Sequence, residues 1–144
     1  MTEGKQTPKV MIVPCSGIGK TFGSVSREAA YCITEDLRPA TTQLMPLAML
    51  VLGDECSRSA MQANPAITID GCKLACAAKM VQQTGGAIAQ EIAVLDVYRR
   101  HKDLRPDGIA ELNEPGIKLA HALAEEVAVT VDALMGEQME SQNG

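Results

Sequence analysis

Cysteine side chains offer the clearest chemistry in this chain of 144 residues. Cys72 and Cys76 are four positions apart, and residues with this spacing share one face of a helix. Both thiols can therefore point at the same object from a single helix. The unpaired N–H groups and the dipole at a helix start favour thiolate over thiol. Because paired zinc ligands are separated by about two to four residues, this pair predicts two ligands of a zinc ion. Two small core residues on a buried helix face are the alternative explanation.

Cys15 is the third candidate ligand, and it follows a short apolar run near the N-terminus. The turn Pro14-Cys15-Ser16-Gly17 presents its thiol, with Ser16 and Gly17 as supporting residues. Glycine leaves the backbone free to bring N–H groups close to an anionic centre. A cysteine that simply fills a strand end is the alternative explanation, and we favour the ligand interpretation.

Cys56 is the preferred fourth ligand, because it lies near the start of its own predicted helix. Oxygen ligands or water in its place would leave an open site, which would imply chemistry. Cys32 falls about eight residues into its helix, roughly 12 Å from the helix start at about 1.5 Å per residue. It also lies on the apolar face of that helix, so core packing explains Cys32 better than metal binding does.

The segment 66–79 must position the central cysteine pair. β-Branched residues at its start favour a short buried strand, and the Ala, Lys and Leu residues that follow favour a helix. Asp70 and Gly71 form a tight turn between the two. Asp70 can cap the helix, which we expect to begin at Cys72, while Gly71 lets the backbone turn sharply.

Strand and helix signals alternate along the chain, which predicts an α/β fold with a small, mostly parallel sheet. Right-handed crossovers would place helices on both faces, giving a three-layer sandwich around about four strands. Pro46 argues that the second strand is an edge strand, contains a bulge, or starts late near Leu47. The predicted strands cover residues 10–13, 42–50, 66–69 and 92–97, and the longer helices cover 24–37, 72–84 and a last segment that begins with Asn113 as N-cap.

Two of the candidate ligands follow directly after predicted strands. Cys15 comes just past the first strand, and Cys72 comes just past the third. Ligands of open parallel sheets bind at the carboxyl ends of the strands. Two loops that are distant in sequence can therefore meet at one edge of the sheet, each bringing a cysteine.

Composition and charge exclude several classes of function. The length fits one domain, which we place at residues 9–136 between flexible tails at 1–8 and 137–144. A net charge of −5 without a basic stripe, and only three aromatic residues, argue against nucleic-acid binding. No apolar segment approaches the ~20 residues of a membrane span, so a membrane partner is not expected.

The five cysteines are an odd number and too few for a disulfide scaffold of this length. The first apolar run, at 10–13, is much shorter than a signal-peptide core of roughly 7–15 residues. We therefore expect a cytoplasmic, reducing location, where cysteines serve metal or redox chemistry. The last predicted helix carries a broad apolar face that includes Leu123, Ala128 and Met135, which leaves homodimerisation open.

The order of these motifs resembles a known family. Val13-Pro14-Cys15-Ser16-Gly17, followed by Ile69-Asp70-Gly71-Cys72 and Cys76, resembles the small prokaryotic proteins named for a central Asp-Gly-Cys (DGC) motif. The resemblance spans most of residues 10–98, although the family often has proline where this chain has Lys73. It implies a zinc-binding protein with no settled activity, in which Cys15, Cys72 and Cys76 are metal ligands.

Thiol chemistry is the first alternative function. An incomplete ligand set would leave a reactive thiolate that could accept sulfur, form a disulfide or hold an iron–sulfur cluster. The expected helix-start position of Cys72 motivates this hypothesis. The sequence does not decide whether the protein is an enzyme.

Nucleotide binding is the second alternative. Gly19-Lys20-Thr21 matches the end of a phosphate loop, within a glycine-rich turn at residues 17–21. The first glycine of that motif would fall at Pro14, which lacks the N–H and the backbone freedom that the position uses. We therefore describe the loop as degenerate.

Overall fold

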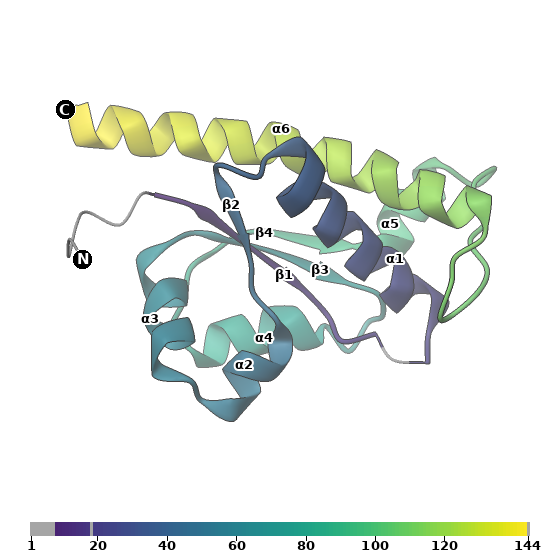
Figure 1. Cartoon of the computed structure of the whole chain (residues 1–144), viewed down its shortest axis with the longest axis horizontal. Helices are drawn as coiled ribbons and strands as arrows, with labels where there is room; N and C mark the ends of the chain where they lie inside the picture. The colour runs from purple at the N-terminus through teal and green to yellow at the C-terminus, as the bar shows by residue number, and fades with distance from the viewer. Residues whose placement is uncertain (1–7, 18, 144) are drawn as a thin grey trace.

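A computed structural model describes residues 8–17 and 19–143 of the chain, with side chains to residue 138. The predicted tail at 1–8 falls, apart from Pro8, outside the described residues. The elements follow the chain in this order (Figure 1): β1 Val10–Pro14, α1 Thr21–Tyr31, the π-helix η1 Cys32–Leu37, β2 Thr42–Leu44, α2 Leu47–Leu52, α3 Glu55–Ala63, β3 Ala66–Asp70, α4 Cys76–Gln83, β4 Ile88–Ala93, α5 Val94–Arg100 and α6 Glu114–Asn143.

The sheet is parallel throughout, with the strand order β2-β1-β3-β4. Ile12 of β1 pairs with Leu44 on one side and with Ile67 on the other. All residues of β1 and β3 are buried, as expected for central strands covered on both faces. Because the strands are parallel, the carboxyl ends of β1 and β3 open at the same edge of the sheet.

Helices cover both faces of this sheet, which confirms the predicted three-layer α/β sandwich. Alternate residues of β1 point to opposite faces. Val10 and Ile12 pack in the core formed with α1, α5 and α6, whereas Met11 and Val13 pack in the core that includes residues of α2, α3 and α4. Figure 1 shows α6 running along one face and the α2–α3–α4 group on the other.

Several element boundaries differ from the sequence-based expectation. The second strand is an edge strand as predicted, but it ends at Leu44, and Pro46 is the N-cap of α2 rather than part of a strand. The fourth strand occupies Ile88–Ala93, and residues 94–97 are already helical. Val94 and Val97, which suggested a strand, are buried core residues at a helical spacing of three. The helix expected at 24–37 begins at Thr21 and ends in a π-helical segment.

The last helix begins as the sequence predicts. Asn113 Oδ1 accepts a hydrogen bond from the N–H of Gly116 at 2.8 Å, the geometry of an N-cap. The helix then continues past Gly136 to Asn143, further than expected. Leu123 and Ala128, part of the proposed dimer face, are buried against the rest of the chain. None of the helices in the described part of the chain is long and apolar enough to cross a membrane.

Candidate functional site

A cavity of about 190 Å³ opens at the carboxyl ends of β1 and β3. We call it the cysteine cavity, because Cys15, Cys72 and Cys76 all line it. The supporting residues predicted from the sequence also line it. The complete lining is Cys15, Ser16, Gly17, Lys20, Gly23, Leu47, Asp70, Gly71, Cys72, Leu74 and Cys76.

Cys15 is held at the floor of the cavity by neighbouring backbone. Its N–H donates to the carbonyl oxygen of Ile69 at 2.9 Å, and its Sγ accepts the N–H of Gly71 at 3.3 Å. Ser26 Oγ lies 3.4 Å from the same sulfur and already donates its proton to the carbonyl oxygen of Gly23. A hydroxyl has one proton to donate, so Ser26 offers the Cys15 sulfur an acceptor in this arrangement. The side chain is only 8% exposed.

Three glycines allow the segments around Cys15 to touch through their backbones. A Cβ atom added to Gly71 would lie 2.6 Å from the backbone nitrogen of Gly23, and Cβ atoms on Gly17 or Gly23 would overlap the other residue's backbone. Gly17 also has a φ of +62°, which favours glycine. Sequence reasoning missed this role of Gly23, since its close approach to Gly71 joins segments far apart in the chain and leaves no local signal.

The helix that follows the Asp-Gly-Cys turn begins later than expected. α4 starts at Cys76, so Cys72 lies in the preceding loop and the two cysteines do not share a helix face. That prediction was wrong, because Asp70 caps the helix across several intervening residues. Its carboxylate oxygens accept the N–H groups of Ala77 at 2.9 Å and Ala78 at 3.2 Å, which belong to the first turn of a helix that starts at Cys76.

Asp70 is buried, and the pKa of its carboxyl is raised overall. Burial raises the pKa of the Asp70 carboxyl, while the bonds from Ala77 and Ala78 lower it. The nearby carboxylate of Glu91 also raises this pKa, and Lys79 lowers it. Since both carboxylate oxygens accept backbone N–H groups of α4, Asp70 serves first to hold that helix, and with it Cys76, at the cavity.

The three thiols differ in access to solvent. Cys15 is buried, Cys72 is half-buried and Cys76 is exposed. Among the described residues, no group of three or more His, Cys, Asp and Glu side chains is arranged so that it could hold a metal ion. The thiols therefore line one cavity without being gathered around a single point.

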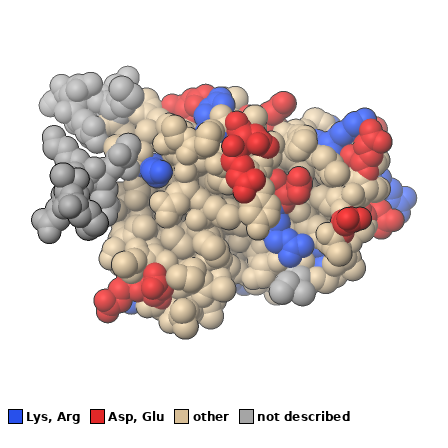
Figure 2. Space-filling view, viewed as in Figure 1, with Lys and Arg blue, Asp and Glu red and all other residues tan. Residues whose placement is uncertain are grey.

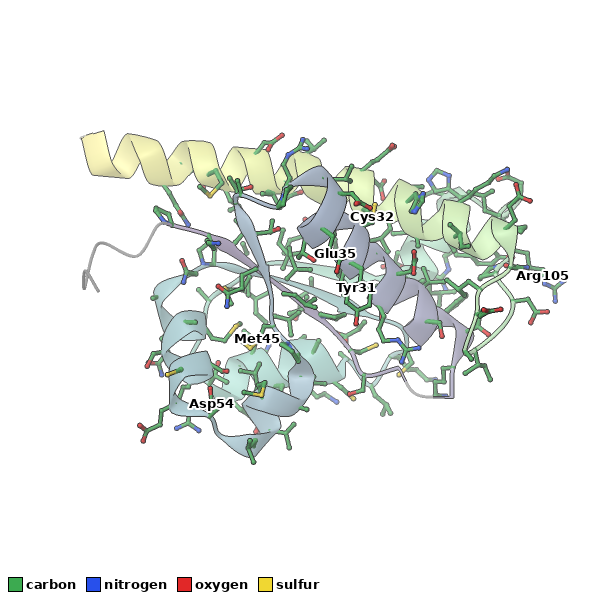
Figure 3. The ribbon with its side chains drawn as sticks, viewed as in Figure 1. Tyr31, Cys32, Glu35, Met45, Asp54 and Arg105 are labelled. Atoms are coloured by element: carbon green, nitrogen blue, oxygen red, sulfur yellow. The ribbon has the colours of Figure 1, made fainter. Side chains whose placement is uncertain are left out.

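The two remaining cysteines lie elsewhere. Cys56 is exposed in the first turn of α3 and does not line the cavity, so the structure does not bring the preferred fourth ligand to the other three. Cys32 packs in the core between α1 and α6 (Figure 3). Burial, reinforced by Asp36, Glu28 and Glu125, raises the pKa of the Cys32 thiol, which keeps it neutral.

The glycine-rich loop leads directly into α1. That helix starts at Thr21, immediately after Lys20, rather than at the expected residue 24. Lys20 is the N-cap and makes no side-chain capping bond, although it lines the cysteine cavity. Pro14 occupies the last position of β1 and offers no N–H to a phosphate.

Comparison with known proteins identifies the family. Residues 11–115, well over half of the chain, match the family model for the DGC domain. The chain belongs to the DGC-domain family. The match includes every residue of the cysteine cavity, and the predicted resemblance is confirmed. No match was found among curated proteins or among solved structures.

Each residue of the motif that names the DGC domain makes a separate contact in this chain. Asp70 caps α4, and Gly71 donates its N–H to the sulfur of Cys15. Cys72 places its thiol on the wall of the cavity. The motif thus connects the end of β3 to Cys15 through Gly71, and to the helix that carries Cys76 through Asp70.

Proposed function

We propose that this DGC domain binds a zinc ion in the cysteine cavity through the thiolates of Cys15, Cys72 and Cys76. The observation that supports the proposal is that three cysteines, from two segments more than 50 residues apart, line one cavity. Thiolates are preferred ligands of zinc and of other thiophilic ions. A fourth position would be left to water or to an added ligand, as in zinc sites that keep an open position.

Zinc binding would gather thiols that the described structure holds apart. Residues 71–75 form a loop between β3 and α4, in which Lys73 and Leu74 are exposed. Cys72 can therefore move without disturbing the sheet. At Cys15 the N–H of Gly71 already donates to sulfur, and Ser26 could turn its proton from Gly23 to a thiolate. Because each thiol loses its proton on binding, zinc affinity should rise with pH.

Metal analysis of the purified full chain tests the proposal. We expect about one equivalent of zinc, as one site predicts. Cys72→Ser and Cys76→Ser should each lower zinc affinity by about tenfold or more in competition with a chromogenic chelator. Cys56→Ser is the matched control, because this exposed cysteine lies outside the cavity and should leave zinc affinity unchanged. Full zinc retention in the variants at positions 72 and 76 would overturn the proposal.

Thiol–disulfide or sulfur-transfer chemistry is the second candidate. It is favoured by the exposure of Cys76 beside the half-buried Cys72, without a preassembled ligand set among the described residues. A reducing compartment such as the cytoplasm would keep both thiols available. Incubation of zinc-free protein with oxidised glutathione, followed by peptide mass analysis, should then give a Cys72–Cys76 disulfide. Zinc should block that reaction if the first proposal is correct.

A further inference from the structure

A second cavity, of about 210 Å³, adjoins the cysteine cavity on the side of β2 and α2. Cys15, Ser16 and Leu47 line both cavities. Arg27 and Tyr31 of α1 line the second cavity, which we call the Arg27 cavity, but not the cysteine cavity. They also line a third cavity of about 490 Å³ on this side of the molecule. The lining of the Arg27 cavity contains no other charged residue. It is therefore a largely apolar space with a single cation at its edge.

The guanidinium of Arg27 keeps free hydrogen-bonding capacity. Nη1 donates to the carbonyl oxygen of Ser16, and Nη2 donates to Ser24 Oγ, each at 3.2 Å. Both acceptors are neutral, and within the described residues Arg27 makes no ion pair with a carboxylate. A guanidinium carries five N–H donors, so several remain for an anionic ligand. Glu28 and Glu111 line a third cavity together with Arg27, but neither is among its ion-pair partners in the described part of the chain.

Tyr31 completes the polar side of the Arg27 cavity. It follows Arg27 by one helical turn, so both side chains extend from the same side of α1. Tyr31 is 45% exposed, and in Figure 3 it lies on the front of α1, on the side where β2 and α2 are found. The opposite wall is apolar and includes Leu44, Pro46 and Leu47. Figure 2 shows that the surface over β2 and α2 is almost free of charged side chains.

We infer that the Arg27 cavity binds a small aliphatic carboxylate. Its carboxylate lies on the guanidinium of Arg27, within reach of the Tyr31 hydroxyl, and its hydrocarbon part lies against the wall of β2 and α2. The planar guanidinium fork matches a carboxylate, and one cation beside an apolar wall fits a monoanion. The small volume limits the ligand to a few carbon atoms. The proposal does not depend on metal binding, although the shared Cys15 and Leu47 would place this ligand beside the cysteine cavity.

Titration of the full chain with 4-methylpentanoate, followed by two-dimensional NMR, tests the inference. We expect saturable shifts in α1 and β2 with a Kd of about 1 mM or lower. The uncharged isostere 4-methylpentanamide should bind about tenfold more weakly or worse, because the charge-assisted bonds are lost. Arg27→Gln should weaken carboxylate binding by a similar factor. Arg58→Gln is the matched control, since Arg58 is exposed on α3 and outside the cavity.

Several results would overturn the inference. These are the absence of saturable binding, equal binding of the amide, unchanged binding by Arg27→Gln, or tighter binding of inorganic phosphate than of the carboxylate. If Arg27→Gln does not fold, Arg27→Lys keeps the charge without the fork and should still bind more weakly. Cys72→Ser should bind 4-methylpentanoate normally, so a failure of this inference is distinguishable from a failure of the zinc proposal.

Discussion

The backbone N–H of Gly71 donates a hydrogen bond to the sulfur of Cys15 over 3.3 Å, across 56 positions of sequence. Both residues lie at the ends of adjacent parallel strands, and both are buried. A peptide group fixed by a strand end cannot move away when the thiol ionises. The sulfur of Cys15 is therefore held at a set distance from the Asp-Gly-Cys turn, whatever the other cysteines do.

Gly23→Ala should disrupt this arrangement. The added methyl group would collide with the backbone of Gly17, and neither segment can move without shifting Cys15 or Gly71. We expect a loss of about 1–3 kcal/mol in unfolding free energy, the usual cost of overpacking. Gly136→Ala is the control, since it lies in α6 with nothing within 4 Å and should stabilise the helix by about 0.5–1 kcal/mol. Urea denaturation of both variants measures the difference, and a neutral Gly23→Ala would contradict the close packing.

Removal of the cap on α4 should loosen one side of the cysteine cavity. Asp70→Ala leaves the N–H groups of Ala77 and Ala78 without their acceptors, which should cost about 1–2 kcal/mol of stability. It should also weaken zinc binding, because the first turn of α4 carries Cys76. Asp54→Ala removes the equivalent cap from α3, where Ser57 is the donor, and should leave zinc affinity unchanged. Equal zinc affinity in both variants would show that Asp70 does not position the site.

Alkylation of the native, zinc-free protein should follow the exposure of its thiols. Cys56 and Cys76 should react first and Cys72 more slowly, whereas Cys15 and Cys32 should react only after unfolding. Burial and nearby carboxylates raise the pKa of Cys32, which slows it further. Zinc should protect Cys72 and Cys76 but not Cys56. Peptide mass analysis after a short pulse of iodoacetamide measures the order, and zinc protection of Cys56 would contradict the proposed ligand set.

Thr68→Val should stabilise the sheet. The side chain of Thr68 is fully buried in β3, and its hydroxyl has no hydrogen-bond partner among the described residues. An unpaired buried hydroxyl carries a desolvation cost, so we expect a gain of about 1 kcal/mol. Thr42→Val is the matched control, because the Thr42 hydroxyl donates to the carbonyl oxygen of Arg38 at 2.7 Å. That variant should lose about 1 kcal/mol of unfolding free energy, and thermal denaturation of both variants measures the difference.

The ion pair between Arg38 and Asp132 should give stability a dependence on acid pH. Two short contacts, of 2.7 and 2.8 Å, join η1's end to α6, and hydrogen bonding to Arg38 lowers the pKa of the Asp132 carboxyl below its usual 3.8. The stabilisation is present above the unfolded-state pKa and is lost as the pH falls through the lower folded-state value. Both side chains are partly exposed, so the effect should be small and weaker in high salt.

Asp132→Asn should remove that part of the pH dependence. Melting temperatures between about pH 2 and pH 7, a range that brackets the usual carboxyl pKa of about 4, would measure it. NMR titration of the Asp132 carboxyl would measure the pKa directly. Asp96→Asn is the control, since Asp96 pairs with Arg99 over a longer distance of 3.3 Å on the same helix. A normal pKa for Asp132 would contradict the pairing.

Much of the fold could be predicted because its signals are local. The apolar run of β1 and the β-branched residues of β3 identify the central strands, and the alternation with helices requires a parallel sheet. Once the sheet is parallel, Cys15 and Cys72 must meet at its carboxyl edge. Asn113 identified the start of α6 because capping involves neighbouring residues. The cysteine motifs are also local, so their order along the chain was sufficient to suggest the DGC family.

Contacts between distant segments decided the rest. The short apolar runs after Pro46 and after Ala93 fit either a strand or a helix, and only packing against the core selects the helix. The start of α4 depends on a carboxylate several residues earlier, so the sequence by itself placed Cys72 in the wrong element. The position of Cys56 outside the cavity and that of Arg27 beside it depend on how the helices pack on the sheet. Local patterns determined the central strands and which cysteines lie at their carboxyl edge, while tertiary packing determined where the other elements begin and what surrounds those cysteines.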